Sequence, residues 1–172
     1  MTDKISLRKE KIQERDSVSK EERALAEINT ATHFMNNYGE LDFWKVSIYF
    51  PIKNEVPTKT IASYIRDSGK KCFLPFIDKN LNNKEMKFSE FTNEVSLVKN
   101  KFNIPESLNS SLTIGSELEL VIMPLVAFDD KGYRLGMGQG YYDFTFRNFL
   151  LNKKQVFLGL AYDFQKTESC YP

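Results

Sequence analysis

The sequence predicts an α/β fold: a single domain with a three-layer arrangement, in which a mainly parallel sheet is flanked by helices. The main observation is that segments with strand patterns alternate along the chain with segments of helical periodicity. The length of 172 residues suits one domain with one sizeable core. No internal repeat, low-complexity segment or convincing linker divides residues 1–172 into two units.

Two helices are predicted at the start of the chain. Residues 3–15 carry charges on most faces of a helical pattern. Ser19 and Glu22 have the spacing of a capping box, in which a serine caps the helix start and a glutamate follows three residues later. The second helix therefore begins after Ser19, and we expect it to end near Gly39.

A strand, a helix and a second strand follow. Residues 44–50 alternate in part between apolar and polar side chains, which predicts a strand that Pro51 ends. Pro57 begins the third helix, and Gly69 is expected as its C-terminal cap. Residues 72–77 form an apolar run that predicts the second strand.

Strands and helices continue to alternate in the rest of the chain, although residues 92–117 are only weakly patterned. The predicted elements are, in order, a turn at 80–83, a short strand at 86–91, a loop with short elements over 92–117, a strand at 118–123, a helix at 142–151 and a buried strand at 156–162.

The composition and the sequence patterns exclude several classes of binding partner and several cellular locations. The 24 basic and 23 acidic residues nearly cancel, which gives no reason to expect binding to nucleic acid or to an anionic membrane. The N-terminal residues are too charged for a signal peptide, and no apolar run is long enough to span a bilayer. Cys72 and Cys170 lack metal-ligand spacing and do not indicate a disulfide framework. We expect a soluble cytoplasmic protein.

Three alternating glycines, Gly136, Gly138 and Gly140, are the strongest functional signal. Glycines allow positive φ angles and let backbone N–H groups approach a ligand closely, so such a loop can hold a phosphate. The G-x-G-x-G spacing matches neither the Rossmann nor the P-loop fingerprint, so the pattern by itself is weak. The alternative is a loop that needs glycine only for tight turning.

Charged and aromatic residues around the glycines favour the functional interpretation. Arg134 offers a planar fork for a phosphate or a carboxylate, although a solvated loop arginine is common. Asp143 could hold a magnesium ion, or could be favoured there by the helix dipole alone. Tyr141 and Tyr142 could stack on a flat heterocycle or anchor the helix to the core.

Two further groups of residues are candidates for the same site. Lys4 and Arg8 share a helix face and could, with Arg15, supply positive charge to phosphates, the alternative being a solvated helix. Glu55 follows the end of a strand, where open α/β sheets bind ligands, and Phe50 could form an apolar wall beside it.

Residues 123–143 resemble the signature of the 5-formyltetrahydrofolate cyclo-ligase family, also called methenyltetrahydrofolate synthetases. The family pattern MPG-x-x-FD-x-x-G-x-RLG-x-G-x-GYYD is matched almost position for position, with Leu125 where the family usually has Gly. Residues 4–8 resemble the family's K-x-x-LR element, and Phe50 and Glu55 its strand and x-E-x-x-T-x-x-I segment. Residues 161–165 resemble its A-x-x-x-Q segment, so the resemblance covers essentially the whole chain.

The resemblance implies an ATP-dependent ligase that closes a C–N ring. Its products would be 5,10-methenyltetrahydrofolate, ADP and phosphate, made from 5-formyltetrahydrofolate and MgATP through a phosphorylated formyl intermediate. Arg134 and Tyr141 are implied as catalytic, and Asp143 as a ligand of Mg²⁺. The implied ATP-binding residues are Lys4, Ile5, Ser6, Leu7, Arg8, Arg134, Leu135, Gly136, Met137, Gly138, Gln139, Gly140, Tyr141 and Tyr142. The implied substrate-binding residues are Phe50, Glu55, Met137, Gly138, Gln139, Gly140 and Tyr141.

One departure from the family pattern keeps other interpretations open. Family members continue after the A-x-x-x-Q segment to an aspartate that serves as a second magnesium ligand, whereas the sequence given stops at Pro172. Either the product is shortened or the sequence is a partial one. The alternatives are a non-catalytic folate- or nucleotide-binding protein of the same fold, and a paralogue acting on another formylated or carboxylated small molecule. In each case the expected partners are small molecules, and the expected state is a monomer or a weak homo-oligomer.

Overall fold

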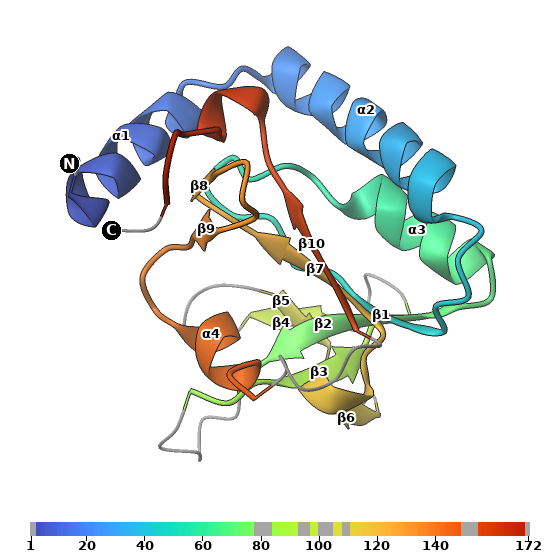
Figure 1. The fold of residues 1–172 in the computed structure, drawn as a ribbon. Helices are drawn as coiled ribbons and strands as arrows, with labels where there is room; N and C mark the ends of the chain where they lie inside the picture. The colour runs from blue at the N-terminus through green and yellow to red at the C-terminus, as the bar shows by residue number, and fades with distance from the viewer. Residues whose placement is uncertain are drawn as a thin grey trace.

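The structure, a computed structural model, describes residues 3–77, 84–92, 97–99, 105–107, 111–148 and 155–170. At its centre is one sheet of six strands (Figure 1). The strands are β1 (Lys45–Ser47), β2 (Lys71–Phe76), β3 (Lys87–Glu90), β6 (Leu112–Ile114), β7 (Leu120–Pro124) and β10 (Val156–Leu160). Their order across the sheet is β10-β7-β1-β2-β3-β6.

The sheet is mainly parallel, as the sequence predicted. Strands β10, β7, β1 and β2 run parallel to their neighbours, with Val46 of β1 aligned with Cys72 on one side and Leu120 on the other. Strands β3 and β6 extend this sheet in antiparallel pairing beyond β2. The antiparallel edge was not anticipated, because residues 112–114 lie in the weakly patterned stretch.

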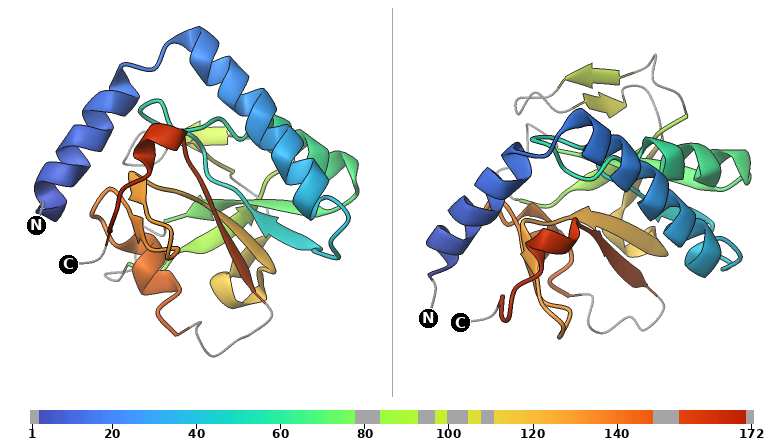
Figure 2. Two further views of the ribbon diagram at one scale, coloured as in Figure 1. Left: turned by 45° about the horizontal axis from the view of Figure 1, so that its top comes forward. Right: turned by 90° about the horizontal axis from the view of Figure 1, so that it is seen from above.

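Side chains that alternate along the strands build two cores. Leu120 and Ile122 of β7 belong to the core under α2 (Lys20–Tyr38) and α3 (Lys59–Asp67). Val121 and Met123 belong to a second core, which Tyr141 and Tyr142 of α4 (Tyr141–Thr145) also contact. Because successive strand residues point to opposite faces, this alternation produces the predicted three layers. Figure 2 shows α2 and α3 side by side over one face of the sheet.

The helix ends follow their capping residues. Ser19 accepts a hydrogen bond from the Glu22 backbone and Glu22 accepts one from Ser19, so the predicted capping box is present at the start of α2. Gly69 follows α3 with a φ of +74°, a conformation that favours glycine just beyond a helix. The helix α1 (Lys4–Asp16) also lies where it was predicted.

The short elements expected within residues 92–117 are the antiparallel pair β4 (Leu97–Lys99) and β5 (Pro105–Ser107), together with β6 and a 3₁₀ turn, η2 (Gly115–Glu117). The helix α4 ends at Thr145, earlier than expected, where the threonine hydroxyl accepts the Met86 backbone N–H. The predicted turn at 80–83 and the predicted helix beyond residue 148 lie outside the described residues.

The order of the strands determines where a ligand can bind. From β1 the chain continues to β2 on one side, whereas β7 is followed by β10 on the other side. Loops that leave the C-terminal ends of two such strands diverge and leave a crevice between them. Here these are the loop after β1 and the loop after β7, which leads to the hairpin β8 (Ala127–Phe128) and β9 (Arg134–Leu135). No helix in the described ranges is long and apolar enough to cross a membrane.

Candidate functional site

A cavity of about 600 Å³ lies at the crevice between the ends of β1 and β7. It is bounded by the loop after β1, the glycine loop after β9 and the N-terminal half of α1. Its lining brings together most of the predicted site residues: Lys4, Arg8, Phe50, Glu55, Arg134, Leu135, Gly136, Met137, Gly138, Gln139, Gly140, Tyr141, Tyr142 and Asp143. Segments more than a hundred residues apart in the sequence therefore form one site.

The glycine loop has a backbone that only glycine adopts readily at two of its positions. Gly138 has a φ of +88° and Gly140 a φ of +72°, with Gly140 immediately before the first residue of α4. A Cβ atom built on Gly138 would lie 3.6 Å from Cζ of Arg8. The loop therefore needs glycine for its conformation, and at Gly138 a side chain would reach the Arg8 guanidinium.

Helix α1 presents a stripe of basic residues to this loop. Lys4, Arg8, Lys11 and Arg15 follow one another at intervals of three or four residues, so they share one face of the helix. Arg8 Nε donates a hydrogen bond of 2.8 Å to the carbonyl of Gly136. Lys11 Nζ donates one of 2.8 Å to the carbonyl of Phe164. Helix α1 thus contacts the glycine loop through Arg8.

Arg134 and Asp143 face each other across the glycine loop. Arg134 Nη2 lies 2.7 Å from Asp143 Oδ1, and the guanidinium lies 5.6 Å from the centre of the Tyr142 ring. Asp143 is in the first turn of α4, and 75% of its side chain is exposed. Both residues line the cavity, so Arg134 can exchange its partner for an anion bound in the loop.

Asp143 offers one carboxylate to a metal ion. Magnesium is commonly held by one or two carboxylates together with substrate phosphates and several waters. A single exposed carboxylate at the end of the glycine loop fits that pattern. Within the part of the chain that the structure describes, no group of three or more histidine, cysteine, aspartate or glutamate residues could form a complete metal site.

Glu55 is buried in the wall of the cavity. Only 4% of its surface is exposed, and Oε2 accepts the Ile52 N–H at 3.0 Å. Burial raises the pKa of the Glu55 carboxyl, while the Ile52 N–H and the nearby Arg15 oppose that effect. Glu55 is therefore not a solvated loop residue. A buried carboxylate in the wall of a cavity is suited to accept hydrogen bonds from a flat heterocycle.

Arg15 does not line the cavity and has a different contact from the one expected. Its Nη1 lies 3.8 Å from Glu55 Oε1 and donates to the carbonyl of Leu125 at 3.2 Å. Only 1% of its surface is exposed. Arg15 therefore supports Glu55 and the loop after β7 instead of facing phosphates beside Lys4. The signal in the sequence was its position on the basic stripe of α1, which does not say what the arginine meets.

Three residues implied as ATP-binding do not line the cavity. Ile5 and Ser6 are exposed on α1. Leu7 packs with Ala127, Leu135 and Cys170 in a small core under the hairpin. The side chain of Leu7 thus holds α1 in place, which brings Lys4 and Arg8 to the glycine loop.

Of the two roles considered for Tyr141 and Tyr142, the structure shows the anchoring of the helix to the core. Both line the cavity and both pack against the core formed by Phe73, Phe88 and Val121. Burial raises the pKa of the Tyr142 hydroxyl, which therefore stays protonated. These tyrosines anchor the start of α4 while leaving part of their surface to a ligand.

Leu125, the departure from the family pattern, is accommodated by a glycine on the neighbouring strand. A Cβ atom built on Gly159 of β10 would lie only 2.7 Å from Cδ2 of Leu125. The larger residue after β7 therefore uses the space that the missing side chain at position 159 leaves. Leu125 also lines the cavity, where it adds apolar surface next to Pro124.

The chain is similar to proteins of one family over nearly its whole length. A model described as the 5-formyltetrahydrofolate cyclo-ligase family matches residues 1–170. The 5-formyltetrahydrofolate cyclo-ligase of Haemophilus influenzae is 32% identical over 146 residues, which are 84% of this chain and 77% of the relative. The protein of the same name from Escherichia coli is 32% identical over 126 residues, or 72% of this chain and 68% of the relative.

Solved structures agree with these relatives. The NMR structure of Aquifex aeolicus 5,10-methenyltetrahydrofolate synthetase superposes with a TM-score of 0.82 at 28% identity, covering 98% of this chain and 82% of that one. A 5,10-methenyltetrahydrofolate synthetase from Mycoplasma pneumoniae has a TM-score of 0.78 over 99% of this chain and 92% of its own. Its identity of 23% supports the fold alone.

Proposed function

The chain belongs to the 5-formyltetrahydrofolate cyclo-ligase family, and we propose that it converts 5-formyltetrahydrofolate and ATP into 5,10-methenyltetrahydrofolate, ADP and phosphate. The observation that carries the proposal is that one cavity is lined by the glycine loop, two basic side chains of α1 and a buried carboxylate. The first two suit the phosphates of ATP, and the carboxylate suits the pterin of a folate. A site for only one of these ligands would not need both parts.

The phosphates of ATP would lie against the glycine loop. Phosphoryl transfer depends mainly on positioning and on neutralising charge, with little covalent help from the protein. Arg8 already contacts the loop carbonyl at Gly136, and Lys4 lines the same cavity. Arg134 can turn from Asp143 to the transferred phosphoryl group, where its charge stabilises the transition state. These side chains surround the place where negative charge develops.

The folate would lie between Glu55 and the glycine loop. Glu55 accepts hydrogen bonds from the pterin, and Phe50 forms an apolar wall beside it. This places the formyl group at residues 137–141, next to the phosphates. The formyl oxygen then attacks the γ-phosphorus and ADP leaves. The secondary amine at position 10 attacks the activated formyl carbon and loses its proton, and phosphate departs with the C–O bond.

Asp143 is the residue that would hold magnesium. The ion would supply positive charge that offsets the negative charge of the phosphates. Asp143 stands at the rim of the cavity, at the start of α4, where its exposed carboxylate can reach such a complex. Its present partner, Arg134, would then be released toward the phosphates.

The proposal is tested by mixing the protein with MgATP and 5-formyltetrahydrofolate and following the absorbance of the methenyl product. We expect product only with ATP, and none when ADP replaces it. Gly138→Val places a branched side chain at a φ of +88° against Arg8, and we expect ATP affinity to fall roughly a hundredfold or more.

The matched control is Gly69→Val. Gly69 has a similar φ of +74°, but a Cβ atom there would meet nothing within 4 Å, and Gly69 does not line the cavity. This variant has a comparable backbone strain and should keep the ATP affinity of the wild type. Folded protein that binds folate and makes no product with MgATP would contradict the proposal and favour a binding protein. Equal loss of ATP affinity in both variants would show that the loop is only structural.

A further inference from the structure

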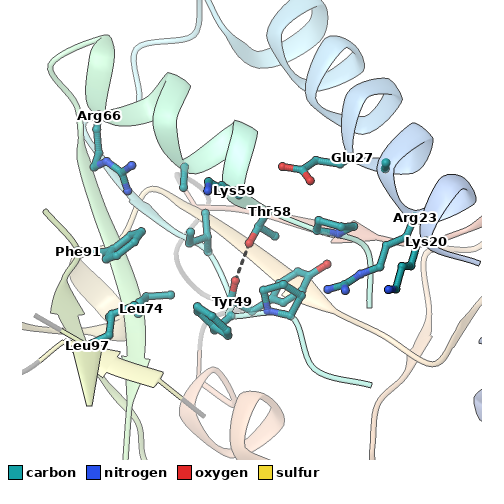
Figure 3. A pocket seen from close by; sticks show the side chains of 16 residues that line it. Lys20, Arg23, Glu27, Tyr49, Thr58, Lys59, Arg66, Leu74, Phe91 and Leu97 are labelled. Carbon is teal, nitrogen blue, oxygen red and sulfur yellow. Dashed lines mark hydrogen bonds between the residues drawn. The ribbon is translucent and has the colours of Figure 1, made fainter. Parts of the chain in front are cut away.

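The loop after β1, residues 50–57, carries Glu55 and is closed at its base. The hydroxyl of Thr58, at the start of α3, donates a hydrogen bond of 2.8 Å to the carbonyl of Tyr49, which the dashed line in Figure 3 marks. The hydroxyl of Tyr49 donates one of 2.7 Å to the carbonyl of Val56. These three residues are buried, so both ends of the loop are fixed to the core. The direction of the tip, residues 52–55, depends on other contacts.

The tip of this loop is a tight turn with an unfavourable backbone. The Glu55 N–H donates to the Ile52 carbonyl at 3.0 Å, which closes four residues into a turn. The two central residues, Lys53 and Asn54, have φ angles of +47° and +57°, as both central residues of a type I′ turn have positive φ. Among the described residues, these are the only two other than glycine with positive φ. Asparagine tolerates this conformation better than lysine does, so the turn costs free energy.

The shape of the turn sets the direction of the Glu55 side chain. Glu55 Oε2 accepts the Ile52 N–H at 3.0 Å, so the carboxylate and the backbone of Glu55 both bond to the same residue. The other carboxylate oxygen, Oε1, lies 3.8 Å from Arg15 Nη1. The Ile52 N–H also opposes the rise that burial causes in the pKa of the Glu55 carboxyl. If the turn opened, Glu55 would lose both its orientation and this support for its charged form.

Asn54 connects the turn to the end of α1. Its Nδ2 lies 3.4 Å from the carbonyl oxygen of Arg15 and 3.4 Å from that of Asp16. The last carbonyls of a helix lack partners within the helix, so the amide supplies a donor there. Each contact is long and weak alone, but the Arg15–Glu55 pair joins the same end of α1 to the carboxylate. Strained backbone that its surroundings hold in place is typical of functional sites.

We propose that Asn54 is a positioning residue for the folate, which holds the turn of residues 52–55 closed so that Glu55 is oriented toward the pterin before the ligand binds. This inference rests on the proposed function. A group that is already oriented loses little conformational freedom on binding, which increases affinity. An open turn would have to close again around the folate. The affinity for ATP would not change, because its phosphates lie at the glycine loop and not at Glu55.

Two substitutions separate the backbone of Asn54 from its amide. Asn54→Gly keeps a residue that adopts positive φ readily and removes the amide, whereas Asn54→Ala loses both properties. We expect the alanine variant to bind 5-formyltetrahydrofolate roughly tenfold more weakly than the wild type, and the glycine variant roughly threefold more weakly. Calorimetry without ATP measures these dissociation constants. A titration with MgATP alone should give the wild-type affinity for both variants.

The matched control for an alanine at positive φ is Gly69→Ala. Gly69 has a φ of +74°, a Cβ atom there would meet nothing within 4 Å, and the residue lies outside the cavity beside the glycine loop. Urea unfolding should show a loss of stability in this variant as in Asn54→Ala. Its affinities for folate and for ATP should both equal those of the wild type.

A double-mutant cycle with Glu55→Gln tests whether Asn54 acts through the carboxylate. Glutamine keeps the shape of Glu55 and removes its charge, so folate binding in this background should depend less on how the side chain is held. We expect Asn54→Ala to weaken folate binding by a clearly smaller factor in the Gln background than in the wild type. An equal factor in both backgrounds would show that Asn54 does not act through Glu55.

Three further results would overturn the inference. If Asn54→Ala loses stability but binds folate as the wild type does, the turn is only structural, and product formation with MgATP would show that the proposed function still stands. If the affinity for ATP falls by the same factor as that for folate, the loss comes from a general loosening of the protein. If the wild type neither binds folate nor forms product, both proposals fail together.

Discussion

At the scale of single residues, the buried pair of Arg15 and Glu55 connects α1 to the loop after β1. Both side chains are nearly inaccessible to solvent, and their charged atoms are 3.8 Å apart. Removing a carboxylate from water favours its neutral form, and Arg15 only partly offsets that cost. Glu55 is therefore held ready for a ligand at some expense in stability, as is common for groups at functional sites.

This cost in stability predicts that the effect of Glu55→Gln on the free energy of unfolding depends on pH. The folded state raises the pKa of Glu55 above its ordinary value of 4.5, so the folded protein binds this proton more tightly than the unfolded chain. The contribution of Glu55 to stability is therefore fully present below pH 4.5 and is lost as the pH rises through the folded pKa. The Gln variant lacks this loss, and the contributions of the other titrating groups cancel when the two proteins are compared.

Urea unfolding of both proteins at several pH values measures the effect. We expect the free energy of unfolding of the variant to improve relative to that of the wild type as the pH rises from 4.5 toward neutrality. The attraction of Arg15 for the ionised carboxyl is already part of the net pKa shift, because it opposes the effect of burial. A difference that is constant with pH, or that moves in favour of the wild type, would contradict the shift assigned to Glu55.

At the scale of elements, the start of α2 positions two basic residues of a second cavity, which lies between α2, α3 and the ends of β1 and β2. The capping box fixes the first turn of the helix, and that turn carries Lys20 and Arg23. Hydrogen bonds from Ser19 also lower the pKa of Glu22, which keeps its carboxylate charged at the positive end of the helix dipole. The capping box therefore also determines where Lys20 and Arg23 lie.

Replacing the capping residue should therefore loosen the first turn of α2. We expect Ser19→Ala to lower the free energy of unfolding by about 1 kcal/mol, because the Glu22 N–H loses its acceptor. Asparagine is an equally good N-cap, so Ser19→Asn serves as the matched control and should stay close to the wild type. Chemical denaturation measures both. Equal stability of the alanine variant and the wild type would show that the box contributes nothing to the folded state.

The elements that were predicted well are those whose signals are local. Ser19 with Glu22 marks a helix start, Gly69 a helix end, and the apolar run at residues 72–77 a buried strand. The strands within residues 92–117 carry no such signal. They form because β6 pairs with β3 at the edge of the six-stranded sheet and β4 pairs with β5 in a separate two-stranded sheet, and this pairing depends on tertiary contacts.

The site was predicted in its parts but not in its contacts. The glycines, Arg8 and Glu55 were identified from spacing, from helix periodicity and from the family signature, and they share one cavity. The partner of Arg15 was not predictable, because periodicity gives the face of a helix and not what lies opposite. The cavity between α2 and α3 was missed for the same reason. Arg23 and Arg66 lie on different helices, and only the packing of α2 on α3 brings them to one cavity.

At the scale of the whole molecule, three distant segments meet at the carbonyl groups after β7. Arg15 of α1 donates to the carbonyl of Leu125, and Gln165 Nε2 donates to the carbonyls of Leu125 and Val126, both at 2.9 Å. Gln165 Oε1 accepts the Tyr162 N–H, which closes the turn after β10. The helix at one end of the chain and the turn near the other end thus fix the strand end that forms one wall of the cavity (Figure 1).

Because Gln165 is central to this junction and only 1% of its surface is exposed, we expect its replacement to lower the stability strongly. Gln165→Ala removes a donor to two carbonyls and an acceptor for one N–H, all inside the protein, and should lower the free energy of unfolding by about 2–4 kcal/mol. Glu168→Ala, at an exposed position nearby, should change it little. Urea unfolding of the two variants at neutral pH gives the comparison.

Gln165→Glu separates hydrogen bonding from packing, because the two side chains have nearly the same shape. At neutral pH a carboxylate would face the two carbonyl oxygens without a proton to donate, so this variant should be at least as unstable as the alanine variant. Near pH 4 a protonated carboxyl can donate to one of the carbonyls, and part of the loss should be recovered. A Glu variant as stable as the wild type at neutral pH would show that the carbonyls do not need Gln165. The tie between the two ends of the chain would then rest on Arg15 and on Lys11, whose ammonium donates to the Phe164 carbonyl beside the same turn.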